Sequence, residues 1–478
     1  MSNEKVQIPS RFESLEHMAP SEEERSLIVR PVKAALAVID EVRDDMESAG
    51  QGAFMVLQGL SGSGKSTFLH TLHLFREGVR TLRVELAQPV DEALDDLLEA
   101  PERLRVVVLA DRDVPARVTD EEIERALHAI NQFIRSREGR RTLVVWPCNS
   151  DEVVDRIVAK ADLIGRDALL GLHPRGYHFD GPPKSEYIEI AQKTIAALNG
   201  GASMISFGIT DERARQLAEQ APTMGAYLHA LRGEERRNRS ALFNLLPEKE
   251  RYNLWVVVIA GNEPETEVAT LTSGAYFGAD IDRLLASTDA NVVQDLKRYP
   301  AKLGLLARSF DARILHVPFM TALAVVRDVA DDDLRKRLAE SGFTVRGSGD
   351  GVERLAKSQL ARALRAEPVT PLPAGRPPGE QQREEFVKLT QFARVDDGAL
   401  NRTMAEALRR AGLIESFKAE DPVSGAQRRN TDILCALRDG SVRLEFMWRA
   451  TTNVGEIARY VLEKLYSYGR AIGFLNGG

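Results

Sequence analysis

A strand, a glycine-rich loop and a helix follow one another between residues 53 and 75, and this succession constrains the fold more than any other feature. The apolar stretch AFMVLQ, residues 53–58, predicts a buried strand, and the loop GLSGSGKST follows it directly. Leu69, Leu72 and Phe75 then share one side of a helix. A buried strand that turns directly into a helix is typical of a parallel sheet covered by helices.

The alternation of strands and helices continues to about residue 165. Further strands are predicted at 81–86 (TLRVEL), 105–111 (RVVVLAD) and 142–147 (TLVVWP). Between the last two, Thr119 and Glu122 have the spacing of a capping box at the start of a helix. The sequence therefore predicts an α/β fold, with a parallel sheet carrying helices on both faces.

The loop after the first strand has the spacing G-x-x-x-x-G-K-[ST], formed by Gly59, Gly64, Lys65 and Ser66. Glycines allow backbone amides to wrap around phosphate groups, and the N-terminus of the next helix adds partial positive charge. Lys65 can reach the β- and γ-phosphates, and the Ser66 hydroxyl can bind Mg²⁺. ATP and Mg²⁺ are thus the expected cofactors, although GTP remains an alternative to ATP. The predicted nucleotide-binding residues are Gly59, Leu60, Ser61, Gly62, Ser63, Gly64, Lys65, Ser66 and Thr67.

Two acidic residues follow the apolar strand at 105–111. Asp111 is the candidate metal ligand, and Asp113 could orient an attacking water. Arg112 stands where a second acid usually follows the metal-binding aspartate, which leaves the hydrolytic base open. The alternative for both aspartates is a solvated strand end.

With these motifs, residues 20–235 resemble the AAA+ and STAND branches of the P-loop NTPases. The resemblance implies ATP hydrolysis, a helical lid over residues 184–235, and a polar sensor residue at the end of the strand after the metal-binding one. Asn149 matches that sensor position, so Lys65, Asp111, Asp113 and Asn149 are the candidate catalytic residues.

The same resemblance implies arginines near the nucleotide. Candidates in the lid are Arg213 and Arg215, with solvated surface as the alternative. Candidates that a neighbouring subunit would supply are Arg135, Arg137, Arg140 and Arg141, with a charged loop as the alternative. The resemblance therefore also favours a homo-oligomer.

The last hundred residues follow a proline-rich stretch at 366–384. Residues 430–449 predict two strands joined at Asp439-Gly440, and a long helix follows. This arrangement resembles the PD-(D/E)XK fold of restriction endonucleases, in which two acids hold Mg²⁺. Asp432 and Glu445 match the two acids, but Met447 occupies the position of the assisting lysine, for which Lys464 is a possible substitute. The site is therefore degenerate, and binding of nucleic acid or a partner protein is the alternative to cleavage.

The predicted organisation has six parts: an N-terminal helical linker (1–50), a P-loop NTPase core (51–183), the lid (184–235), a mostly helical middle domain (236–365), the proline-rich linker (366–384) and an α+β nuclease-like domain (385–478). The formal net charge of −7 gives no general attraction to nucleic acid, and the two cysteines provide no disulfide framework. No apolar run is long enough for a membrane span, so a cytoplasmic protein without a membrane partner is expected.

The expected function is a P-loop ATPase that acts as a motor or switch in a nucleic-acid transaction, such as bacterial defence against phage. Two alternatives remain open. One is a nucleotide-dependent signalling scaffold whose C-terminal domain binds only a partner, and the other is an ATP-gated, Mg²⁺-dependent nuclease.

Overall fold

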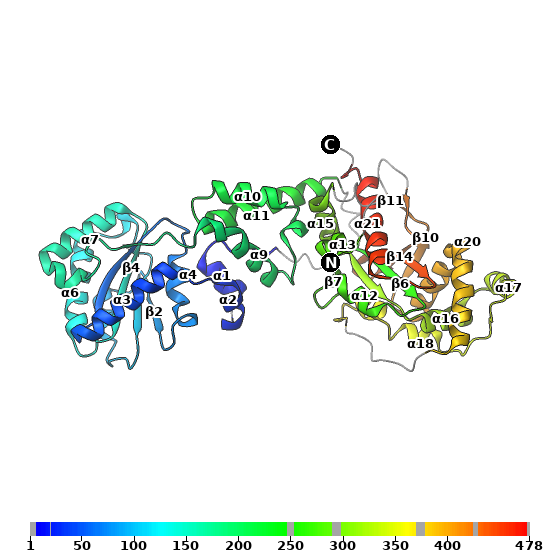
Figure 1. Ribbon diagram of the computed structural model, residues 1–478, viewed down its shortest axis with the longest axis horizontal. Helices are drawn as coiled ribbons and strands as arrows, with labels where there is room; N and C mark the ends of the chain where they lie inside the picture. Colours follow the sequence, from blue (N-terminus) through cyan, green and yellow to red (C-terminus); the bar gives the residue numbers. More distant parts are fainter. Residues whose placement is uncertain are drawn as a thin grey trace. The chain divides into compact units, whose positions relative to one another are not determined.

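The computed structural model describes residues 6–19, 21–245, 253–288, 298–369, 378–423 and 429–475, which fall into two compact units. The N-terminal unit comprises Gln7–Leu198 and Ala214–Arg232. The C-terminal unit is built mainly from Asn199–Arg213 and Gly233–Gly478. Each unit contains its own sheet, labelled in Figure 1.

The sheet of the N-terminal unit has five parallel strands in the order β2-β3-β4-β1-β5. It confirms the predicted α/β fold with a parallel sheet. Because β4 lies between β1 and β3, the carboxyl ends of these three strands meet along one edge of the sheet. The strands are β1 (Ala53–Gln58), β2 (Arg80–Val84), β3 (Arg105–Leu109), β4 (Thr142–Cys148) and β5 (Tyr177–His178).

Helices cover both faces of this sheet (Figure 1). Alternate residues of β1 point to opposite faces, so Met55 packs with α3 and α4, whereas Phe54 packs with α5, α6 and α7. Residues of α3 such as Ile39 are buried in this core, which differs from the predicted linker over residues 1–50. The helices are α3 (Lys33–Ala49), α4 (Lys65–His70), α5 (Val90–Asp95), α6 (Asp120–Arg135) and α7 (Asp151–Ile164).

The predicted lid over residues 184–235 contains helices, but it is not a body of its own. Its part up to Leu198 and its part from Ala214 to Arg232 belong to the N-terminal unit, and the division between the units falls within α10 and α11. The remaining helices in and around this unit are α1 (Phe12–Met18), α2 (Glu22–Ile28), α8 (Arg166–Leu170), α9 (Tyr187–Leu198), α10 (Asp211–Gln220) and α11 (Met224–Phe243).

The sheet of the C-terminal unit is mixed and has seven strands in the order β10-β13-β14-β6-β9-β8-β7. Antiparallel pairing of β13 with β14 confirms the hairpin predicted near Asp439-Gly440. On its other side β14 pairs in parallel with β6, from Val442 opposite Asn253 to Arg449 opposite Ala260. The strands are β6 (Asn253–Ala260), β7 (Thr272–Ser273), β8 (Gly278–Ala279), β9 (Arg313–His316), β10 (Ser416–Ala419), β13 (Ile433–Leu437) and β14 (Gly440–Arg449); β11 (Pro422–Val423) and β12 (Arg429–Asn430) form a separate pair.

This pairing differs from the prediction of separate domains at 236–365 and 385–478. Strands from both segments form one sheet, and their apolar residues share one core. The physical reason is that β6 is apolar on both faces and needs a neighbour along each edge, and β14 supplies one of them. Residues 370–377 of the predicted linker lie outside the described residues.

Helices also cover both faces of this second sheet (Figure 1). On β14, Trp448 faces α20 and donates a hydrogen bond to Asn401, whereas Glu445 faces α21. Helix α20 is kinked at Asp396, which has φ −150° and ψ 77°. Helices α12 (Glu265–Thr270), α13 (Ile281–Ala286) and α15 (Pro300–Ser309) contact α21 (Val454–Ala471), and α16 (Phe319–Val329) and α18 (Gly351–Leu355) contact α20 (Glu380–Arg410); α17 (Asp332–Glu340) and α19 (Gln359–Leu364) complete the set.

None of the helices in the described ranges combines the length and apolar character that crossing a membrane requires.

Candidate functional site

The loop between β1 and α4 contains two glycines in the left-handed backbone conformation. Gly62 and Gly64 have φ values of 80° and 102°, in the left-handed region that side chains with a Cβ atom rarely adopt. A Cβ atom on Gly59 would lie 2.4 Å from the carbonyl oxygen of Phe179. The glycines of the sequence motif are therefore required by the backbone and by its close packing.

Lys65 is buried beneath this loop, with 7% of its surface exposed. Its Nζ donates to the carbonyl oxygens of Gly59 at 2.6 Å and Leu60 at 3.1 Å, and to Oδ1 of Asn149 at 2.6 Å. Burial lowers the pKa of Lys65 to about 8, although the charge of Asp113 opposes this shift. All three direct acceptors are neutral groups, so an anion entering the loop would gain a strong interaction with this ammonium.

Asn149, at the end of β4, connects Lys65 to an acid. Its Oδ1 accepts from Lys65, and its Nδ2 donates to the carboxylate of Asp113. The structure thus brings together three of the four candidate catalytic residues.

Asp111, the fourth candidate, takes a different direction. Its backbone has a positive φ of 57°, and its carboxylate accepts from Arg83 of the neighbouring strand β2 at 3.1 Å. The side chain of Asp111 is 61% exposed. The two aspartates that the sequence places two residues apart therefore have different partners: Asp111 pairs with Arg83, and Asp113 pairs with Asn149.

Arg112 lies between the two aspartates in the sequence. Its guanidinium points into the protein interior. It donates to the carbonyl oxygens of Val84, Ala110, Glu85 and Gln88, and its own carbonyl oxygen accepts from the Trp146 indole. This buried arginine holds the segment after β3 against the segment after β2. It fixes the backbone from which Asp111 and Asp113 extend in different directions.

A cavity of about 620 Å³ opens at this edge of the sheet. The loop residues Ser61–Thr67, both aspartates and Asn149 all line it. A volume of this size is typical of a site for a small molecule or cofactor.

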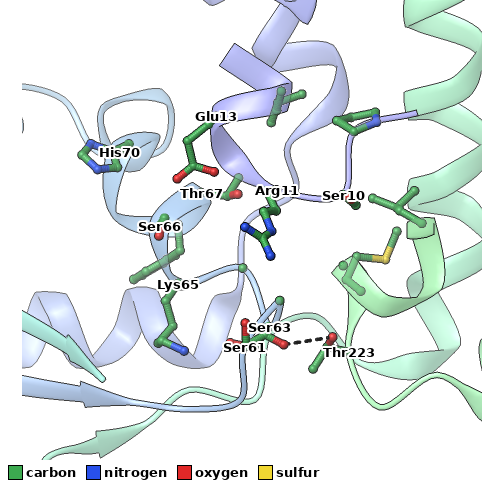
Figure 2. A pocket seen from close by; sticks show the side chains of 18 of the residues that line it. Ser10, Arg11, Glu13, Ser61, Ser63, Lys65, Ser66, Thr67, His70 and Thr223 are labelled. Atoms are coloured by element: carbon green, nitrogen blue, oxygen red, sulfur yellow. Dashed lines mark hydrogen bonds between the residues drawn. The ribbon is translucent and has the colours of Figure 1, made fainter. Parts of the chain in front are cut away.

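Two further walls of the cavity carry no sequence motif. Ser10, Arg11 and Glu13 come from the N-terminal segment, and Arg11 points toward the loop from above it (Figure 2). On the other side, the backbone amide of Gly225 donates to the carbonyl oxygen of Gly62 at 2.9 Å. The Thr223 hydroxyl donates to the backbone carbonyl oxygen of Ser61 at 3.4 Å (Figure 2).

Sequence analysis missed these walls because neither has a characteristic spacing. Among the described residues, the Arg11 guanidinium has no hydrogen-bond or ion-pair partner, and the residue is exposed. The one sequence signal was a basic residue in a polar N-terminal segment. Arg11 becomes a candidate site residue only in the folded structure, where the N-terminal segment lines the same cavity as the loop.

The predicted arginine candidates do not line this cavity. Arg135, Arg137, Arg140 and Arg141 lie between the end of α6 and the start of β4, at the edge of the sheet opposite the loop. In the lid, Arg213 pairs with Glu234 at 3.0 Å. A role for Arg135, Arg137, Arg140 or Arg141 at the nucleotide of a neighbouring subunit stays a prediction.

Three side chains that line the cavity carry oxygen atoms of the kind that bind Mg²⁺. Ser66 provides a hydroxyl, and Asp111 and Asp113 provide carboxylates. Among the described residues, no cluster of three or more histidines, cysteines and acids could hold a metal by itself. This pattern suits Mg²⁺, which proteins commonly bind through one or two carboxylates while phosphates and water complete its shell.

The predicted nuclease residues Asp432, Glu445 and Lys464 also meet in space. Lys464 Nζ donates to Oε2 of Glu445 and lies 3.9 Å from Oδ1 of Asp432. The Tyr468 hydroxyl donates to Oε1 of Glu445 at 2.6 Å. Glu445 has no exposed surface, and Met447, at the usual lysine position, is 1% exposed. Lys464 thus lies beside both acids, and its role as a substitute for the assisting lysine stays a prediction.

Of the aromatic residues near this cluster, Trp448 and Tyr468 are buried. They therefore belong to the core and offer no surface on which nucleic-acid bases could stack.

No protein-family model matches this sequence, and no curated protein is significantly similar to it.

Proposed function

We propose that the N-terminal unit binds and hydrolyses a nucleoside triphosphate, ATP in the first instance, in the manner of a P-loop NTPase of the AAA+/STAND-like branch. One observation carries the proposal. The left-handed glycines, the buried ammonium of Lys65 and the Asn149–Asp113 pair all line a single cavity of about 620 Å³.

In this proposal the chain's own groups divide the work. The loop amides and Lys65 bind the phosphate oxygens, and Arg11 adds a positive charge from above the loop. Asn149 holds Lys65 and Asp113 in fixed positions relative to each other, and the Asp113 carboxylate can accept a proton from an attacking water. Ser66 and one of the two aspartates would hold Mg²⁺, which supplies charge neutralisation at the phosphates.

The proposed biological role is a motor or switch in a nucleic-acid transaction, such as defence against phage. It is supported by the presence, in one chain, of a cavity lined by a glycine-rich loop and a buried lysine, and of a second unit with a mixed sheet and paired acids. Function through a homo-oligomer is part of this proposal. A signalling scaffold is the second candidate. It is favoured over a nuclease because the ammonium of Lys464 lies against Asp432 and Glu445, the two acids that would have to bind the metal ion of a nuclease.

Titration calorimetry and phosphate release at millimolar Mg²⁺ test the proposal. Wild-type protein should bind and hydrolyse ATP or GTP, and Lys65→Ala should lower the rate about 10²–10³-fold because a positive charge that stabilises the transition state is lost. The matched control is Lys160→Ala, which removes an ammonium from the exposed pair with Glu124 in the same unit and should leave the rate unchanged. Absence of heat with both nucleotides would refute the proposal. Repeating the assay with DNA and RNA separates the motor from the scaffold, since only the motor should change its rate.

A further inference from the structure

Lys464 lies where a divalent cation would have to lie if Asp432 and Glu445 formed a metal site. Its ammonium contacts Oε2 of Glu445 directly and lies 3.9 Å from Oδ1 of Asp432. The side chain of Lys464 is 15% exposed and that of Glu445 is fully buried. Any metal ion bridging the two carboxylates would have to displace this ammonium.

The remaining oxygen atoms of the two acids already have donors of their own. Oε1 of Glu445 accepts from the Tyr468 hydroxyl at 2.6 Å and from the Thr431 hydroxyl at 3.2 Å. Oδ2 of Asp432 accepts from the backbone amide of Phe446 at 2.7 Å. A hard cation such as Mg²⁺ needs carboxylate oxygens that can turn toward it, and here protein donors hold them.

The ring of Tyr460 closes the other side of the cluster. Lys464 Nζ lies 5.0 Å from the centre of this ring, and the Tyr460 hydroxyl is used in a hydrogen bond to the Phe446 carbonyl oxygen at 3.0 Å. The ammonium is therefore packed by an aromatic face as well as by two acids, an environment that suits a resident monovalent cation.

We infer that Lys464 is a built-in replacement for the metal ion, so that Asp432 and Glu445 form a metal-independent buried ion-pair centre and the C-terminal unit does not cleave phosphodiesters. Removal of the ammonium converts the two carboxylates into a site for a divalent cation. The inference concerns the C-terminal unit alone and does not depend on the proposed ATPase.

The test uses the full-length protein without nucleotide, after treatment with a chelator, and Mn²⁺ alone as the probe. Bound Mn²⁺ is measured by the loss of the electron paramagnetic resonance signal of the free ion. Wild type and Glu445→Gln should bind the same amount, since Glu445 holds no metal. Lys464→Ala should bind one Mn²⁺ more than wild type at the same free Mn²⁺ concentration. The double variant Glu445→Gln, Lys464→Ala should lose this gain.

Lys357→Ala is the matched control, because it removes an ammonium from the exposed pair with Glu353 in the same unit and should gain no Mn²⁺. Lys464→Met, which keeps an apolar stem of similar length, serves as a second variant should Lys464→Ala fail to fold. Two results would overturn the inference: Mn²⁺ bound by the wild type but not by Glu445→Gln, or folded Lys464 variants that bind no more Mn²⁺ than wild type. If neither variant folds, the comparison of wild type with Glu445→Gln decides.

Discussion

Each unit of this protein contains a lysine close to acids, and the two lysines have opposite environments. Lys65 reaches Asp113 only through the amide of Asn149, and its direct acceptors are neutral. Lys464 contacts Glu445 directly and has Asp432 within 4 Å. Burial favours a lower pKa at both lysines, and it lowers the pKa of Lys65. At Lys464 the nearby negative charges, Glu445 first, outweigh burial, and the pKa is raised.

Two buried ammonium groups can thus differ in whether a ligand can pair with their charge. Among the described residues, no carboxylate contacts Lys65 directly. Lys65 also lines a cavity of about 620 Å³, so a phosphate group can be its partner. The charge of Lys464 is already neutralised within the protein, so the same chemical group becomes a structural element. Direct carboxylate contact, and not burial, separates the two roles.

The largest expected effect is the loss of stability when the ion pair in the C-terminal unit is broken. Lys464→Ala should lower the free energy of unfolding by about 3–5 kcal/mol, because it leaves buried Glu445 without its counter-charge. Urea unfolding followed by the fluorescence of Trp255 and Trp448 measures this, with Trp146→Phe in every variant to silence the third tryptophan, which lies in the other unit.

Lys357→Ala, in the exposed pair with Glu353, should cost about 0–1 kcal/mol in the same experiment. Equal losses of unfolding free energy for the two lysine variants would show that the Lys464 pair contributes no more than an exposed ion pair. The contrast between Lys464 and Lys65 would then fail.

The next largest effect is a difference in the rate of ATP hydrolysis between variants of the two aspartates that line the cavity. Asp113→Asn should lower the rate of ATP hydrolysis about a hundredfold, because Asp113 is the acid held by Asn149 and placed to accept a proton. Asp111→Asn should have the smaller effect, since its carboxylate is largely exposed and paired with Arg83. Single-turnover hydrolysis, with the enzyme in excess over ATP, measures both. A larger loss in Asp111→Asn would reverse the assignment and make Asp111 the important acid, as the sequence alone suggests.

The smallest effect, counted per pH unit, is a pH dependence in the C-terminal cluster. Burial, with the nearby charge of Glu445, raises the pKa of Asp432 to about 7 from a value near 3.8, although Lys464 and the Phe446 amide oppose the shift. Between these two values the folded protein retains a proton that the unfolded chain releases. The stabilisation from Asp432 is therefore complete at low pH and is lost as the pH rises toward 7, by at most about 1.4 kcal/mol per pH unit.

Asp432→Asn mimics the protonated acid and should flatten this slope, measured by urea unfolding at several pH values between 4.5 and 7.5. A slope that is the same in wild type and Asp432→Asn would show that Asp432 titrates normally, and would remove the charge balance on which the comparison with Lys65 rests.

Much of the local structure was predictable because it depends on neighbouring residues. The strand, loop and helix around Lys65 follow from apolar runs separated by glycines, and the capping box of Thr119 and Glu122 forms as expected. The hairpin of β13 and β14 follows from its turn residues. In each case the signal lies within about ten residues, so the backbone responds to it without help from the rest of the chain.

Long-range contacts were not predictable in the same way. Sequence spacing cannot show that Asp113 contacts Asn149 while Asp111 turns to Arg83, because the positive φ of Asp111 and the buried Arg112 set these directions. Nor does spacing reveal that Arg11 lines the same cavity as the loop.

By itself, the sequence determined the residue types and local conformations: a glycine-rich turn before a helix, two acids after a strand, and a lysine on a late helix. Tertiary structure alone decided which of these groups meet. It joined β6 to β14 in one sheet and placed Lys464 between two acids. The physical reason is that charge interactions depend on distance and burial, and both are set by packing between segments far apart in the chain.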